Sequence, residues 1–155
     1  MNALTAAFTG LGDKLAAHVL LSTSALALGL FLALPLSVWS SRSPRVAAVS
    51  LGLASLIQTI PGLALLALFY PILVSLGALT GLAIPALGFV PALLALTLYA
   101  LLPILRNAVT ARQRMDHEVL EAADALGMTS WQKLRLVEIP LALPYIVAGI
   151  RTAVV

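Results

Sequence analysis

Long apolar runs, separated by short polar segments, limit what this chain can fold into more than any other feature of its sequence. A helix needs about 20 apolar residues to cross a hydrocarbon layer about 30 Å thick. The runs reach that length, and only 10% of the residues are charged while 61% are hydrophobic. A soluble domain has too little polar surface to cover so many apolar side chains. The sequence therefore predicts an all-α, polytopic helical membrane protein with a single transmembrane domain over residues 1–155.

Four transmembrane spans are expected, over about residues 17–39, 46–76, 89–108 and 139–155. The first run is longer than the apolar core of a signal peptide, so it is expected to stay in the protein. The second is too long for one straight crossing, and Pro61, which lacks an N–H, is expected to kink or break it. The fourth is still apolar where the sequence stops, which indicates that the chain is truncated at its C-terminus.

The positions of the Lys and Arg residues indicate how these spans are oriented. One face receives most of them, namely Arg42, Arg45, Arg106, Arg112, Arg114, Lys133 and Arg135. The opposite face receives Lys14. By the positive-inside rule, the charged loop over residues 109–138 is cytoplasmic and the N-terminus is outside. Because the basic residues are spread over several loops and do not form a stripe, no nucleic-acid partner is expected.

The charged loop carries the start and stop signals of two short helices. Asp116 is a typical N-cap residue, and Gly127 stands where a glycine would end the helix that Asp116 begins. Thr129 and Gln132 have the spacing of a capping box, which would start the second helix. The pattern predicts two helices joined at Gly127 and Met128.

The first of these helices has a face with little side-chain bulk. Ala122, Ala123 and Ala125 leave its backbone open to close approach by another surface. Val119, Leu120 and Leu126 are expected to pack beneath it. Two interpretations remain open: an amphipathic linker that lies on the membrane, or a docking element for a soluble partner.

The same residues resemble the EAA loop of binding-protein-dependent ABC importer permeases. That pattern runs E-A-A, three residues, G, nine residues, I-x-L-P, and the loop matches it with apolar replacements at two positions. The resemblance implies that residues 109–138 form a coupling loop that contacts an ATPase subunit. The residues expected to carry this coupling are Glu121, Ala122, Ala123, Gly127, Val137, Ile139 and Pro140.

Three further segments, residues 57–66, 99–107 and 149–153, resemble the osmoprotectant branch of these permeases, which import glycine betaine, carnitine and choline. The resemblance implies a MetI-like helical bundle in the bacterial cytoplasmic (inner) membrane. It also implies a transport subunit that is not itself an enzyme. The expected partners are an ABC ATPase, which hydrolyses ATP, an extracytoplasmic substrate-binding protein and a second copy of the permease. The alternatives are a permease for another small solute, such as an amino acid, and an ATPase-independent channel or scaffold.

Polar residues within the apolar runs are candidates for the translocation pathway or its gate. An unpaired amide is costly in such a run, so Gln58 is expected to face a helix interface or the pathway. Thr59, beside Pro61, either does the same or bonds back to its own helix. Arg151 is the one charge inside an apparent span, and its role is either a structural or gating partner or a substrate contact.

No metal site or cofactor is expected. His117 and Glu118 begin an H-E-x-x-H pattern, but its second histidine is absent, and the chain contains no cysteine. The sequence also lacks the glycine-rich motif G-x-x-x-x-G-K-[ST] that cradles phosphates, so ATP chemistry is expected to belong to another chain.

Overall fold

The computed structural model describes residues 3–154, and the side chains of residues 10–40 and 42–154. The described residues are mainly helical and include no strand, in agreement with the predicted all-α fold. In chain order, the elements are α1 (Ala3–Arg42), α2 (Pro44–Thr59), α3 (Gly62–Thr80), α4 (Phe89–Gln113), α5 (His117–Ala125), α6 (Ser130–Lys133), the π-helical turn η1 (Leu134–Glu138) and α7 (Ile139–Val154).

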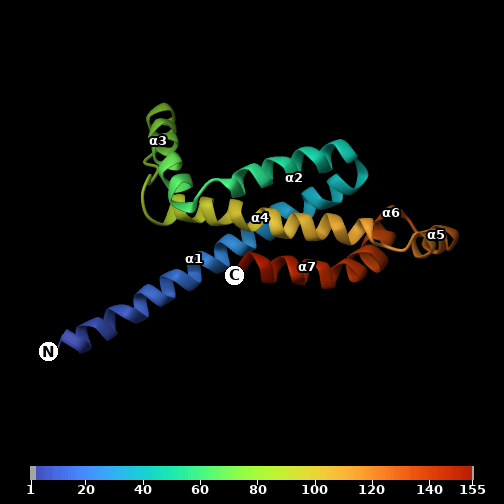
Figure 1. Cartoon of the computed structure of the whole chain (residues 1–155), viewed down its shortest axis with the longest axis horizontal. Helices are drawn as coiled ribbons and strands as arrows, with labels where there is room; N and C mark the ends of the chain where they lie inside the picture. The colour runs from blue at the N-terminus through green and yellow to red at the C-terminus, as the bar shows by residue number, and fades with distance from the viewer. Residues whose placement is uncertain (1–2, 155) are drawn as a thin grey trace.

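Helix α4 is the centre of the bundle, with α1, α2 and α7 packed along it (Figure 1). The core lies between α1 and α4, where Ala33, Ile104 and Leu105 are buried. Glycines allow the backbones to approach closely at two crossings. A Cβ atom on Gly29 would lie 3.1 Å from Ala100 Cβ, and one on Gly149 would lie 3.0 Å from Ile104 Cα. Small residues at helix crossings are typical of membrane proteins.

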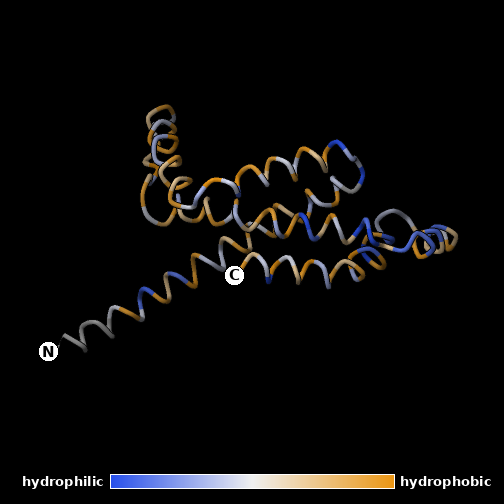
Figure 2. The backbone as a smooth tube through the Cα atoms, in the orientation of Figure 1, coloured by the Kyte–Doolittle hydropathy of each residue, from blue (hydrophilic) through white to orange (hydrophobic). Residues whose placement is uncertain are grey.

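Four helices are long and apolar enough to cross a membrane: Gly10–Ser40, Gly62–Thr80, Phe89–Gln113 and Ser130–Val154. Their outward surfaces carry large exposed apolar side chains. Figure 2 shows hydrophobic colours along the helices, with hydrophilic residues gathered around the α1–α2 turn and the region of α5 and α6. These surfaces are suited to lipid, and the chain is a multi-pass membrane protein.

The expected second span over residues 46–76 is not one kinked helix. It contains two helices, α2 and α3, separated at Ile60 and Pro61, where Ile60 is extended with φ −81° and ψ 123°. A residue that precedes proline avoids the helical region, and proline itself has no N–H to donate. The result is a complete break, after which α3 stands steeply across α2 and α4 (Figure 1).

Helix boundaries also differ from expectation around the charged loop and at the N-terminus. Helix α1 begins at Ala3, well before residue 17, and α4 continues to Gln113, past residue 108. The fourth helix does not begin at Ile139, because α6, η1 and α7 run on without interruption from Ser130. In η1, Ile139 donates its N–H to Leu134 O, five residues back, so the helix is already widened where Pro140 lacks a donor. Val155, where the fourth span was expected to end, lies outside the described residues.

Candidate functional site

The first helix of the loop is capped at both ends as predicted. The Asp116 carboxylate accepts a hydrogen bond from the Glu118 N–H at 3.0 Å. At the other end, Gly127 has a left-handed φ of +72°. The Met128 N–H donates to Ala123 O at 3.2 Å and the Gly127 N–H donates to Asp124 O at 3.0 Å, which is the hydrogen-bond pattern of a Schellman motif. Helix α5 therefore ends at a turn whose shape depends on glycine.

The second helix begins with the predicted capping box. The Thr129 N–H donates to Gln132 Oε1 at 2.8 Å, and the Gln132 N–H donates to Thr129 Oγ1 at 3.3 Å. An ion pair then joins the two helices, with Lys133 Nζ 2.6 Å from Asp124 Oδ1. The two caps set where α5 ends and α6 begins, and the ion pair joins the two helices, so the loop is a helix–turn–helix.

The orientation of α5 differs from expectation at three residues. Ala123, expected on the open face, is buried with 3% of its surface exposed, while Val119 and Leu126, expected to pack beneath, are 42% and 76% exposed. Leu126 is the C-cap residue, so its backbone already departs from the helix and its side chain points away from the underside. Val119, Ala122 and Leu126 share an exposed face at spacings of three and four residues, with Glu121 exposed beside them. The loop thus presents an apolar surface bordered by acidic side chains.

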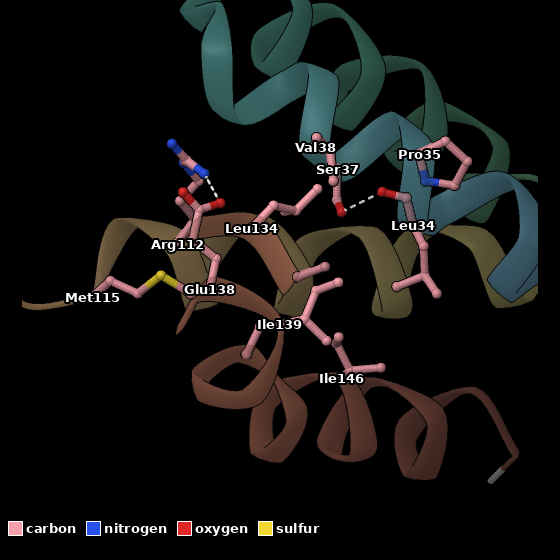
Figure 3. Close-up of a pocket in the computed structure, with 12 residues that line it drawn as sticks. Leu34, Pro35, Ser37, Val38, Arg112, Met115, Leu134, Glu138, Ile139 and Ile146 are labelled. Atoms are coloured by element: carbon pink, nitrogen blue, oxygen red, sulfur yellow. Dashed lines mark hydrogen bonds and ion pairs between the residues drawn. The ribbon is translucent and has the colours of Figure 1, made fainter. Parts of the chain in front are cut away.

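An ion pair between Arg112 and Glu138 ties the end of α4 to η1 at the base of the loop (Figure 3). The Glu138 side chain is 8% exposed and that of Arg112 is 32% exposed. This pair was not predicted from the sequence. Its signal was a lone acidic residue between Val137 and Ile139, in an apolar stretch where a carboxylate needs a cationic partner.

Beside this pair lies a cavity of about 240 Å³ between α1, α4, η1 and α7 (Figure 3). Apolar side chains such as Leu34, Leu134 and Ile146 form most of its wall. Ile139 of the predicted coupling residues also lines it, whereas Pro140 is exposed and Val137 is half-buried. The second half of the motif is therefore built into the helix that leads from the loop to α7.

The candidate pathway residues occupy two places. Gln58 Nε2 donates to Tyr99 O at 3.0 Å, and the Tyr99 hydroxyl donates to Ile60 O, which together tie α4 to the break between α2 and α3. The Thr59 hydroxyl bonds back to Leu56 O at 2.7 Å, the structural alternative that the sequence left open.

The remaining two candidates, Pro61 and Arg151, are not brought together. Pro61 occupies the N-cap position of α3. Arg151 is exposed on α7 and forms no hydrogen bond or ion pair among the described side chains. The neighbouring Thr152 shares a cavity with Gln58, but Thr59, Pro61 and Arg151 do not line that cavity.

Curated proteins of known name align with most of this chain. The curated relatives include the glycine betaine/carnitine/choline transport system permease protein OpuCB of Bacillus subtilis, 41% identical over 142 residues, which are 92% of this chain and 60% of the relative. The osmoprotectant import permease protein OsmW of Salmonella typhimurium is 43% identical over 138 residues, 89% of this chain and 61% of the relative. The carnitine transport permease protein OpuCB of Listeria monocytogenes is 40% identical over 138 residues, 89% of this chain and 58% of the relative. The chain thus spans about 60% of the length of such relatives.

A family model gives the broader assignment. Residues 25–155 match the model described as binding-protein-dependent transport system inner membrane component. That range contains the second part of α1, from residue 25, and every later helix, including the whole loop and its ion pairs. The chain belongs to the family of binding-protein-dependent transport system inner membrane components, with its MetI-like helical bundle.

Proposed function

We propose that this chain is the permease subunit of an ATP-driven ABC importer for a compatible solute such as glycine betaine, choline or carnitine. The family match and the names of the relatives support this function. In the proposed assembly, a separate ATPase chain hydrolyses ATP, an extracytoplasmic binding protein delivers the solute, and a second copy of the permease completes the pathway. The N-terminus lies outside and the coupling loop lies in the cytoplasm.

The observation that carries this proposal is the rigid connection between the coupling loop and α7. Helices α5 and α6 are fixed to each other by Lys133 and Asp124, and α6 continues through η1 into α7. The Arg112–Glu138 pair holds the same segment against α4. A partner that pushes on the loop would therefore move α7 as well, because α6, η1 and α7 are continuous.

Some of the predicted coupling residues would contact the ATPase, and the others would transmit its movement to the membrane helices. Glu121 and Ala122 lie on the exposed face and would touch the ATPase. Ala123 packs inward and Gly127 shapes the turn, so both would set the position of that face. Val137, Ile139 and Pro140 lie in η1 and the start of α7, where they would pass the displacement into the membrane.

Gln58, Thr59 and Pro61 surround the break between α2 and α3, and Arg151 lies on α7, the helix that the loop would move. We propose that the break and α7 contribute to the pathway or its gate. The hydrogen bonds of Gln58 and Tyr99 across the break would then stabilise one conformation of the transport cycle.

Replacing Gly127 tests the coupling role. A Cβ atom at this position would meet nothing within 4 Å, so the obstacle to substitution is the φ of +72° and not a clash. Asparagine tolerates this left-handed conformation, whereas a β-branched residue does not. We expect Gly127→Val to insert normally but to lose ATPase co-purification and solute uptake, while the matched Gly127→Asn retains both. Wild-type uptake by Gly127→Val would contradict the proposal.

Two measurements separate this function from its alternatives. A channel or scaffold should bring no ATPase when the protein is purified with the products of neighbouring coding regions. A permease for another small solute should show uptake that methionine, and not glycine betaine or choline, competes away.

A further inference from the structure

A cavity of about 350 Å³ with polar and apolar residues in its wall lies between α2, α4 and α7. One face of α4 forms most of its wall, through residues spaced as neighbours on a helix surface: Tyr99, Leu102, Pro103, Arg106 and Asn107. Gln58 closes it from α2, and Thr152 and Ala153 close it from α7. The volume falls within the range of about 300–1,000 Å³ that small-molecule sites occupy.

Several polar groups around this cavity donate one hydrogen bond each to nearby backbone. Gln58 Nε2 donates to Tyr99 O at 3.0 Å, Asn107 Nδ2 donates to Pro103 O at 2.8 Å, and the Thr152 hydroxyl donates to Ala148 O at 3.0 Å. The amide oxygens of Gln58 and Asn107 remain as acceptors. The wall therefore offers oxygen atoms with partial negative charge on two of its helices.

Arg106 is the exception, because its donors are not engaged. Among the side chains that the structure describes, it forms no hydrogen bond or ion pair, whereas Arg112 on the same helix is paired with Glu138. Arg106 is exposed, so its guanidinium can meet water or an anionic solute. Its planar fork matches the two oxygens of a carboxylate. Arg106 is thus a cation on the cavity wall without an anionic partner among the described side chains.

We infer that this cavity is a transit site for a small zwitterionic solute, with Arg106 binding the solute's carboxylate and the amide oxygens of Gln58 and Asn107 facing its cationic end. The inference rests on the proposed import function and narrows its substrate class. A quaternary ammonium that carries no carboxylate would meet the repulsion of Arg106 without a compensating contact. The cavity should therefore favour betaine-like zwitterions over choline.

Uptake by the complete importer tests this preference, with radiolabelled glycine betaine and choline each supplied at limiting concentration. A hydrogen bond to a charged group is worth enough that Arg106→Gln should lower glycine betaine uptake about tenfold or more while choline uptake falls less or rises. Arg106→Lys, which keeps the charge without the fork, should give an intermediate ratio. Arg45→Gln removes the same charge at the other end of α2 and should leave the ratio unchanged. An equal loss of both solutes in Arg106→Gln would overturn the inference.

A second measurement does not depend on transport. The 155-residue sequence contains no cysteine, so Thr152→Cys places a single reactive thiol of this sequence in the cavity wall. Anionic methanethiosulfonate reagents should modify it several-fold faster than cationic ones, and adding Arg106→Gln should remove that preference. Equal rates for both reagents with Arg106 present would overturn the inference. If the wild-type importer moves neither solute, the proposed function fails, and the reagent preference still decides whether the cavity selects anions.

Discussion

At the scale of single residues, the Arg112–Glu138 pair shows how unequal two partners in one ion pair can be. The Glu138 side chain is 8% exposed, whereas Arg112 is 32% exposed and can reach water with its guanidinium. Removal of Arg112 leaves a buried carboxylate without a cation, while removal of the Glu138 charge leaves a cation that solvent can partly satisfy. An uncompensated buried charge is the more costly defect.

Arg112→Met should therefore destabilise the protein by about 3 kcal/mol, and Glu138→Gln should cost less. The double variant should recover part of the loss, because it leaves no buried charge. Unfolding midpoints of the purified protein in detergent measure these differences. If Glu138→Gln proves the more harmful variant, or if the double variant equals the sum of the single ones, the pair does not act as described.

At the scale of elements, local sequence signals predicted the two helices of the loop, whereas tertiary packing determines which of their residues are buried. Asp116, Gly127 and Thr129 act within one turn of their own helix, so their roles could be predicted from sequence. The burial of Ala123 depends on what lies beneath α5, which sequence spacing does not encode. Pro61 predicted that the helix would be kinked or broken but not which of the two. The direction of the chain after Pro61 depends on tertiary contacts, such as the hydrogen bond from the Tyr99 hydroxyl to Ile60 O.

Gly149 lies at the crossing of α4 and α7, and Gly52, which lies on an open surface, provides a matched control. A Cβ atom on Gly149 would lie 3.0 Å from both Ile104 Cα and Pro103 O, and these backbone atoms can move only if the helices separate. Gly149→Ala should destabilise the protein by about 1–3 kcal/mol, as overpacking does. Gly52 on α2 meets nothing within 4 Å, so Gly52→Ala should be neutral or stabilising. Unfolding midpoints in detergent compare the two variants. If both lose stability to a similar degree, the close approach of α4 and α7 is not the cause of the loss.

At the scale of the whole molecule, helix lengths determine how often the chain can cross the membrane. Helix α2 has 16 residues, about 24 Å, which is shorter than a hydrocarbon layer of about 30 Å. Helix α3 stands across α2 and α4 and does not continue their direction (Figure 1). The two helices together are therefore best counted as one crossing, which makes three crossings before the coupling loop.

This count places Asp13 and Ser130 on opposite faces. Asp13 precedes Ser40 by 27 residues on one helix, about 40 Å, so it extends past the hydrocarbon layer when Ser40 lies near the other face. We expect Asp13→Cys and Leu82→Cys to react with an impermeant thiol reagent from outside the cell, and Ser130→Cys only in inside-out vesicles. If α2 and α3 each crossed the membrane, Leu82 would react from inside and Ser130 would share the face of Asp13. The three labels thus distinguish the two topologies, because a separate crossing by α3 reverses every later segment relative to the N-terminus.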